Sequence, residues 1–267
     1  MSSLGEPSFA WEPFTPRGVA AFARASLERL LVVQGVFALL AAGAVVWILS
    51  DGIFPVISTA VEALPDRGFI RAGKLEWTDD SPQMLAEGKI LALGVNLNHN
   101  GTLRSPADFQ FEFGRDSLWV YSLFGVAEFP YPTGYIFAAN RHDARPAWGA
   151  WAPEILALTA IGAFFGLLLV WWALATLYFV PVWLIGFFAN RNMNFWSSWK
   201  LAGAALMPGA ALMTLAIFLY DLAAFDLIQF YFAVGMHLVV GWIYLFVSPM
   251  FLNRDEPAAK KNPFADH

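Results

Sequence analysis

The chain has 267 residues, of which 58% are hydrophobic and only 14% charged, and it contains no cysteine. Soluble domains carry about a quarter of their residues as Asp, Glu, Lys or Arg, so this composition excludes an ordinary soluble domain and predicts an integral membrane protein. The lack of cysteine excludes disulfides, thiol nucleophiles and cysteine-ligated metals. The net charge of −5 gives no argument for nucleic acid, which is not expected as a partner.

The first 29 residues are predicted to form a cytoplasmic N-terminal segment. Thr15 and Pro16 have the pattern of a helix N-cap and first turn, and Val19, Phe22 and Leu27 recur at helical spacing. This pattern predicts a short amphipathic helix lying on the membrane surface. An N-terminal extension of the first span into water is the alternative.

Four stretches without Asp, Glu, Lys or Arg are long enough to cross a bilayer, which takes about 20 apolar residues. They predict transmembrane helices within 30–50, 155–190, 201–220 and 227–252. The second stretch is too long for one simple span. Pro181 is expected to separate a span over about 155–179 from a membrane-level segment, and two tightly turned spans are the alternative.

Polar residues inside two of these spans are expected to connect helices. Gln34 and Thr214 are interpreted as interhelical hydrogen-bonding residues. Pro208 is expected to kink the third span, since proline cannot donate a main-chain hydrogen bond.

The orientation follows from the Lys and Arg residues beside the spans, because these residues collect in cytoplasmic loops. They lie within the N-terminal segment, within the connection after residue 190 and within the C-terminal tail, 253–267. The turn between the last two spans instead has two aspartates and no basic residue. The bases are Arg17, Arg24, Arg29, Arg191, Lys200, Arg254, Lys260 and Lys261. Both termini are therefore predicted in the cytoplasm and residues 52–151 outside it.

Residues 52–151 switch to strand-like alternation and predict a small β-rich domain. Leu91 to Leu97 alternates apolar with small or polar residues, and Phe109, Phe111 and Phe113 alternate with polar residues, which indicates strands with one buried face. A hairpin is expected from 108–113 onto 117–121. Further strands are expected at 74–77 and 135–138, about five in all. The sheet is expected to be covered either by 53–64 as a helix or by the membrane surface itself. The segments 129–132 and 141–146 are expected to be loops.

Ionisable residues at membrane depth are costly to bury and therefore point to function. Asp226, Gln229 and His237 lie along one broad face of the fourth span, and Asp221 ends the third. These four are the candidate intramembrane polar residues, and a proton or cation path using Asp226 and His237 is one interpretation. The alternative is that the aspartates lie in a wet turn and that His237 hydrogen-bonds a neighbouring helix.

Known catalytic and cofactor motifs are missing from the sequence. The chain has no Gly-x-Ser-x-Gly, P-loop or Gly-x-Gly-x-x-Gly pattern, and its four histidines are not paired at metal-binding spacing: His99, His142, His237 and His267. No catalytic residue, metal or cofactor is therefore predicted.

Three short motifs carry a resemblance to a known family. They are Thr15-Pro16-Arg17, Gly73-Lys74-Leu75 and the stretch from Lys200-Leu201-Ala202 to Met207-Pro208. With the order of parts, they resemble a bacterial membrane-protein family of unknown function, related to the Yip-type membrane proteins, which includes an accessory protein encoded beside maltodextrin-uptake genes. The resemblance implies the bacterial cytoplasmic membrane and this architecture, and it carries over no catalytic residues.

Two functions are predicted from different classes. The first is a non-enzymatic membrane accessory or interaction protein whose outer domain contacts a partner or ligand. Its expected partners are the lipid bilayer and either another membrane protein or a second copy of the chain. The alternative is a small transporter that uses the polar face of the fourth span.

Overall fold

The computed structural model describes residues 8–254 and divides them into two compact units. We call one the helical unit, which comprises the described residues up to Ala42, Gly162–Tyr220 and those from Ile228. The other is the β unit, which comprises Gly43–Ile161 and Asp221–Leu227. The predicted cytoplasmic tail lies almost wholly outside the described residues.

Four helices of the described chain are long and apolar enough to cross a membrane, in agreement with the four predicted spans. Two of them are interrupted or extended by short turns of another helix type. The bounds are α2 (Leu27–Ile48) continuing through the π-helical η2 (Leu49–Ile53) into α3 (Phe54–Glu62); α4 (Arg141–Phe188); α5 (Phe195–Ala205) with α6 (Met207–Asp221); and α7 (Leu227–Val247) with the 3-10 turn η3 (Ser248–Phe251).

The helix α4 corrects two predictions. It runs without interruption for 48 residues, so the expected break at Pro181 and the alternative of two turned spans are both wrong. Proline removes a single main-chain hydrogen bond, and apolar helices tolerate that loss. The expected loop at 141–146 is also helical, because Asn140 caps this end: its Oδ1 accepts a hydrogen bond from the Asp143 main-chain N–H at 3.0 Å.

The short helix α1 (Pro16–Ala21), which follows the 3-10 turn η1 (Ser8–Trp11), confirms the predicted N-cap. The Thr15 side chain accepts a hydrogen bond from the Gly18 N–H. Val19 and Phe22 are fully buried in the core of the helical unit, where α1 packs against α5 and η3. The apolar face therefore lies against protein rather than lipid. Residues 22–26 separate α1 from α2, so the alternative of one extended helix is wrong.

One buried side-chain amide connects three helices of the helical unit. Gln34 of α2 is fully buried; its Oε1 accepts from the Trp172 indole of α4 at 3.0 Å, and its Nε2 donates to the Gly203 carbonyl of α5 at 3.5 Å. This confirms the predicted interhelical role of Gln34. The same prediction for Thr214 is wrong, because its hydroxyl donates to Ala210 of its own helix.

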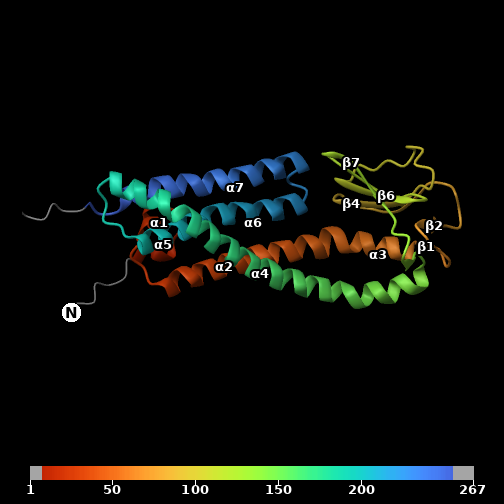
Figure 1. The fold of residues 1–267 in the computed structure, drawn as a ribbon, viewed down its shortest axis with the longest axis horizontal. Coiled ribbons are helices and arrows are strands. Elements are labelled where there is room, and N and C mark those ends of the chain that lie inside the picture. The colour runs from red at the N-terminus through yellow and green to blue at the C-terminus, as the bar shows by residue number, and fades with distance from the viewer. Residues whose placement is uncertain (1–7, 255–267) are drawn as a thin grey trace, which may run out of the picture. The chain divides into compact units, whose positions relative to one another are not determined.

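The third candidate span is broken where proline was expected to disturb it. The helix α5 ends at Ala205, and α6 begins at Met207 with Pro208 in its first turn. Figure 1 shows α6 beside α7. The two approach so closely that a Cβ added to Gly209 would overlap the main-chain oxygen of His237. Small residues at such positions allow helix backbones to pack tightly.

The β unit contains eight short strands rather than five. They are β1 (Phe69–Arg71), β2 (Lys74–Glu76), β3 (Gln83–Glu87), β4 (Leu91–Val95), β5 (Phe109–Phe113), β6 (Ser117–Ser122), β7 (Gly125–Pro130) and β8 (Ile136–Ala138). They form a three-stranded sheet of order β2-β1-β8 and a five-stranded sheet of order β3-β4-β5-β6-β7. The expected hairpin is confirmed as the antiparallel pair β5 and β6, and the expected loop at 129–132 is wrong in part because β7 extends to Pro130.

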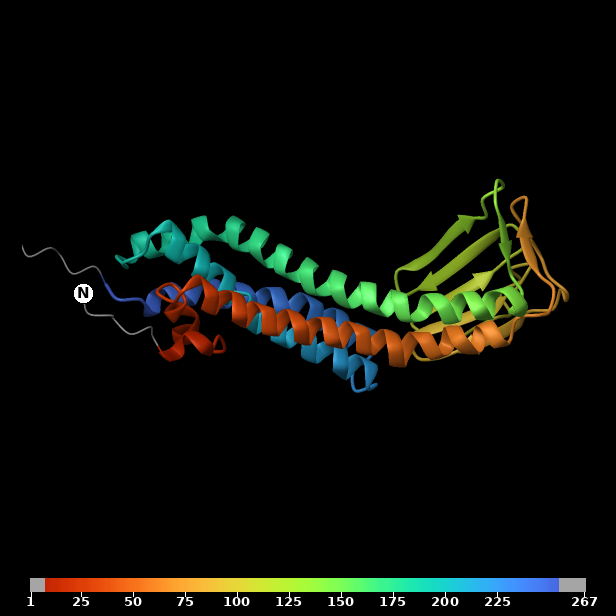
Figure 2. The ribbon, with the colours of Figure 1, turned by 90° about the horizontal axis from the view of Figure 1, so that it is seen from below.

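The connection between β4 and β5 determines which faces of the larger sheet are covered. These two strands are parallel, so residues 96–108 cross over the sheet instead of forming a hairpin. On one face, α3 packs through Val56 and Ala60 on the sheet residues Leu85 and Leu91, which confirms the predicted covering helix. Figure 2 shows the strands, coloured yellow to green, as a twisted layer. The prediction that only one face is buried is wrong, because Gln110 and Glu112 on the other face of β5 are buried too.

Candidate functional site

The four polar residues predicted near the last two spans do not form one cluster. Asp221 ends α6, and its Oδ2 accepts a hydrogen bond from the Trp47 indole at 2.7 Å. Asp226 precedes α7 and is exposed, as is Gln229 in the first turn of that helix. Eight residues separate Gln229 from His237, which is about 12 Å of helical rise and too far for a hydrogen bond.

His237 is half-buried, and its hydrogen bond differs from the expected one. Its Nδ1 contacts the Val234 main-chain oxygen, three residues earlier in α7, rather than a polar group of a neighbouring helix. These contacts neither support nor contradict a proton or cation path through Asp226 and His237, which therefore stays a prediction.

A cluster of buried polar side chains lies on the second face of the larger sheet. Gln110 and Glu112 of β5 are only 6% and 1% exposed, although they alternate with phenylalanines. The crossing segment 96–108 covers them: His99 Nδ1 lies 2.8 Å from Glu112 Oε1, and Gln110 Nε2 donates to the Leu103 carbonyl at 3.1 Å and to Glu112 Oε2 at 3.2 Å. Both Glu112 oxygens are therefore engaged.

Three buried polar atoms on residues of β6 and the crossing segment have no hydrogen-bond partner among the described residues. They are Asn96 Oδ1, His99 Nε2 and Trp119 Nε1. The rings of His99 and Trp119 are in contact, tilted by 52° with 4.8 Å between their centroids. Buried polar atoms of this kind are commonly paired by ordered water. A Cβ added to Gly114 would overlap His99 Nε2, so glycine is required there for the histidine to reach Glu112.

The hydrogen bonds around Glu112 and His99 have a structural role in holding the crossing segment on the sheet. A histidine held by a carboxylate resembles half of a nucleophilic triad. In the described chain, no serine or threonine hydroxyl hydrogen-bonds either ring nitrogen of His99, and no three His, Asp or Glu side chains gather as for a metal. The cluster instead fastens the crossing segment to β5.

Tyr131 fastens the end of the sheet. Its hydroxyl donates to the Gly114 carbonyl at 3.1 Å, and burial, with a contribution from nearby Asp116, raises its pKa above the usual value. Burial likewise raises the pKa of Tyr121, with Glu112 adding to the effect. Both groups favour the neutral phenol in the folded unit.

We expect Tyr131→Phe to lower the stability of the β unit by about 1 kcal/mol at pH 8, the typical value of one hydrogen bond. A pKa raised in the folded state gives stability that is complete below about pH 10, the unfolded pKa, and is lost as pH rises through the folded pKa. The variant should therefore lose less stability than the parent between about pH 10 and 11. Unfolding of both chains across this range tests this, with exposed Tyr135→Phe as control; parallel curves for parent and Tyr131→Phe would contradict it.

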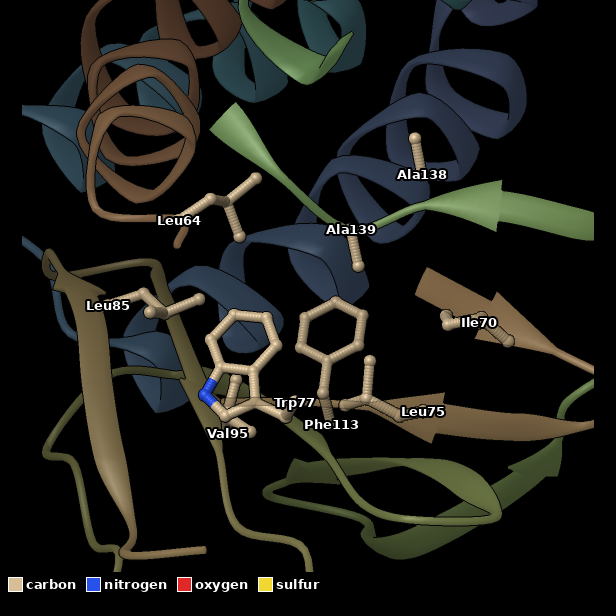
Figure 3. Close-up of a pocket in the computed structure, with 9 residues that line it drawn as sticks. All are labelled: Leu64, Ile70, Leu75, Trp77, Leu85, Val95, Phe113, Ala138 and Ala139. Atoms are coloured by element: carbon tan, nitrogen blue, oxygen red, sulfur yellow. The ribbon is translucent and has the colours of Figure 1, made fainter. Parts of the chain in front are cut away.

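An apolar pocket of about 190 Å³ lies inside the β unit, apart from the polar cluster. Strands of both sheets and the end of the α3 segment supply its walls (Figure 3). The rings of Trp77 and Phe113 lie side by side in it. The lining residues are Leu64, Ile70, Leu75, Trp77, Leu85, Val95, Phe113, Ala138 and Ala139.

The strand β7 forms one edge of the larger sheet and is exposed along its whole length. All six residues are exposed, including Val126 and Phe129 at 55% each. The preceding turn presents Leu123 and Phe124, the latter 74% exposed. An apolar edge strand of this kind is an open site for pairing with another chain.

Comparisons with known proteins give no relative from which a role could be transferred. No protein-family model matches the chain, and no curated protein or solved structure shows significant similarity to it. The resemblance to the Yip-related bacterial family therefore stays a prediction.

Proposed function

We propose that the chain is a non-enzymatic membrane accessory protein that binds a partner by adding a strand to the β7 edge. The observation that carries the proposal is the exposure of every residue of this apolar edge strand. Strand addition obtains affinity from main-chain hydrogen bonds and specificity from alternate side chains. The partner is an extended segment of another membrane protein or of a second copy of the chain.

The main-chain groups of β7 point in alternating directions. The Tyr131 N–H donates to the Asp116 carbonyl at 3.0 Å, which identifies this pair as a hydrogen-bonded one in the ladder with β6. Hydrogen-bonded and non-hydrogen-bonded pairs alternate in an antiparallel ladder, so Val126, Glu128 and Pro130 direct their main-chain groups away from β6. Pro130 is tolerated because its missing N–H would face outwards.

The free edge therefore offers two N–H donors, from Val126 and Glu128, and three carbonyl acceptors. On its faces, Val126 and Phe129 provide apolar contacts, and the Glu128 carboxylate favours a basic residue on the incoming strand. Proline and charge at an edge also limit indiscriminate pairing, which suits a specific partner.

We place this edge outside the cytoplasm of a bacterial cell. The support is the charge bias: Arg29, Arg191 and Arg254 flank one set of span ends, and Asp221 and Asp226 flank the other. Because the chain has no cysteine, single cysteines introduced at Ser81 and Asn192 test this with a membrane-impermeant maleimide. Intact cells should label the first and not the second, and the reverse pattern would refute the placement.

The test of partner binding is a matched pair of substitutions at one position. Glu128→Pro removes an N–H donor that points away from β6, so no hydrogen bond between β6 and β7 is lost. Glu128→Gln removes the charge of the side chain and keeps this N–H donor. Each tagged chain is purified from native membranes in mild detergent, and co-purifying proteins are quantified by mass spectrometry. We expect a stoichiometric partner with the parent and Glu128→Gln, and about a tenfold loss with Glu128→Pro.

As a control, protease resistance of residues 69–138 is measured in both variants to check that the β unit is still folded. Equal recovery of the partner with Glu128→Pro would refute edge pairing. A solitary parent chain, with neither a partner nor a second copy, would refute the accessory function.

A further inference from the structure

The apolar pocket of the β unit is partly open to the surface and is larger than an ordinary packing void. Protein interiors are packed like organic crystals, and voids larger than a water molecule are few. At about 190 Å³, the pocket is larger than an engineered apolar cavity of about 150 Å³ that binds benzene or xenon. The fold therefore maintains a space that its own side chains do not fill.

The lining restricts the chemistry of an occupant. Eight of the nine lining residues carry purely aliphatic or phenyl side chains, and the ninth is Trp77, whose indole N–H is the one polar side-chain group. A water molecule needs two to four polar partners, and the side chains of this lining offer one. No lining side chain carries a charge or an acceptor that would bind a sugar, a nucleotide or an amino acid.

We infer that this pocket binds an unbranched alkyl chain. Its aliphatic and aromatic lining matches methylene groups in chemistry, and its side chains offer no charged partner to a headgroup. A protein with four helices able to cross a membrane is surrounded by such chains. The chain comes either from a membrane phospholipid or from a free alkyl acid. The inference does not depend on β7 or on a protein partner.

The test uses the full chain in lipid nanodiscs, which avoids alkyl detergents. Two probes carry a photoreactive diazirine in the alkyl chain: a free ten-carbon acid and a phosphatidylcholine. After illumination, adducts are located by peptide mass spectrometry. We expect adducts on peptides that contain Trp77 and Leu85, from one probe or both, and the reactive probe identifies the source of the chain.

Substitutions that fill the pocket complete the test. Ala139→Phe places a ring in the pocket, and Ala127→Phe adds the same ring to the exposed face of β7. Adducts at Trp77 should fall about tenfold with Ala139→Phe and stay unchanged with Ala127→Phe. Leu64→Trp fills the pocket from another wall and replaces Ala139→Phe if that variant loses its protease-resistant β unit. Absence of adducts with both probes, or adducts that persist in the filled pocket, would overturn the inference.

Discussion

Replacing Glu112 by leucine is expected to destabilise the β unit by about 1–3 kcal/mol, the cost of leaving buried hydrogen-bonding groups without their partner. The Glu112 side chain is 1% exposed on one sheet face and accepts from Gln110 while contacting His99. Leucine would leave the buried Gln110 amide and the partly exposed His99 ring with fewer hydrogen-bond partners. The segment 96–108, which these bonds hold over the sheet, should detach first.

Hydrogen exchange of residues 69–138 in the full chain measures this effect. Glu112→Leu should raise exchange throughout 96–113, whereas Glu112→Gln, which keeps the shape and one acceptor, should raise it less. Glu76→Leu makes the same change at an exposed position of β2 and should alter stability by no more than about 0.5 kcal/mol. Protection in Glu112→Leu equal to that of the parent would show that the cluster does not hold the segment.

Gly209→Ala is expected to destabilise the helical unit by about 1–3 kcal/mol through overpacking. The added Cβ would overlap the main-chain oxygen of His237, and a main-chain atom cannot move aside as a flexible side chain can. The helices α6 and α7 would have to move apart at this point.

Gly235→Ala is the matched control, because a Cβ at that position of α7 has no heavy atom within 4 Å. Alanine has a higher helix propensity than glycine, so this variant should be neutral or more stable by up to about 1 kcal/mol. Unfolding in graded SDS, followed by tryptophan fluorescence, compares the two. Equal shifts of the two variants would contradict a close contact at Gly209.

The long-range features of the fold could be predicted because they depend on composition over many residues. The absence of charge over about 20 residues predicted the four apolar helices, and strict alternation predicted β4 and β5. Their boundaries could not be predicted as well. Asn140 is a helix-capping residue, but its signal was outweighed by Pro146, which the first turns of α4 accommodate.

The strands that sequence reasoning missed are short or interrupted. The three residues of β1 give no alternation to read, and β7 ends in a proline that normally argues against a strand. Pro130 is compatible with β7 because it lies at an edge. That position depends on which strands pair, and local sequence does not carry this information.

The polar cluster could not be predicted from alternation, because alternation assigns Gln110 and Glu112 to the solvent-facing side of β5. Their burial follows from the parallel pairing of β4 with β5, which sends residues 96–108 across that face. One signal could have suggested it: a histidine-containing turn that precedes a strand with both a carboxylate and an amide on one face.

A photoreactive amino acid at Val126 in native membranes tests the central claim, that the β7 edge binds a partner. The account predicts one discrete adduct, with another membrane protein or with a second copy of the chain, that disappears when Glu128→Pro is introduced as well. The same photoreactive residue at Ser81, in an exposed loop of the same unit, should give no such adduct. Adducts at Val126 no more abundant than at Ser81 would contradict the claim.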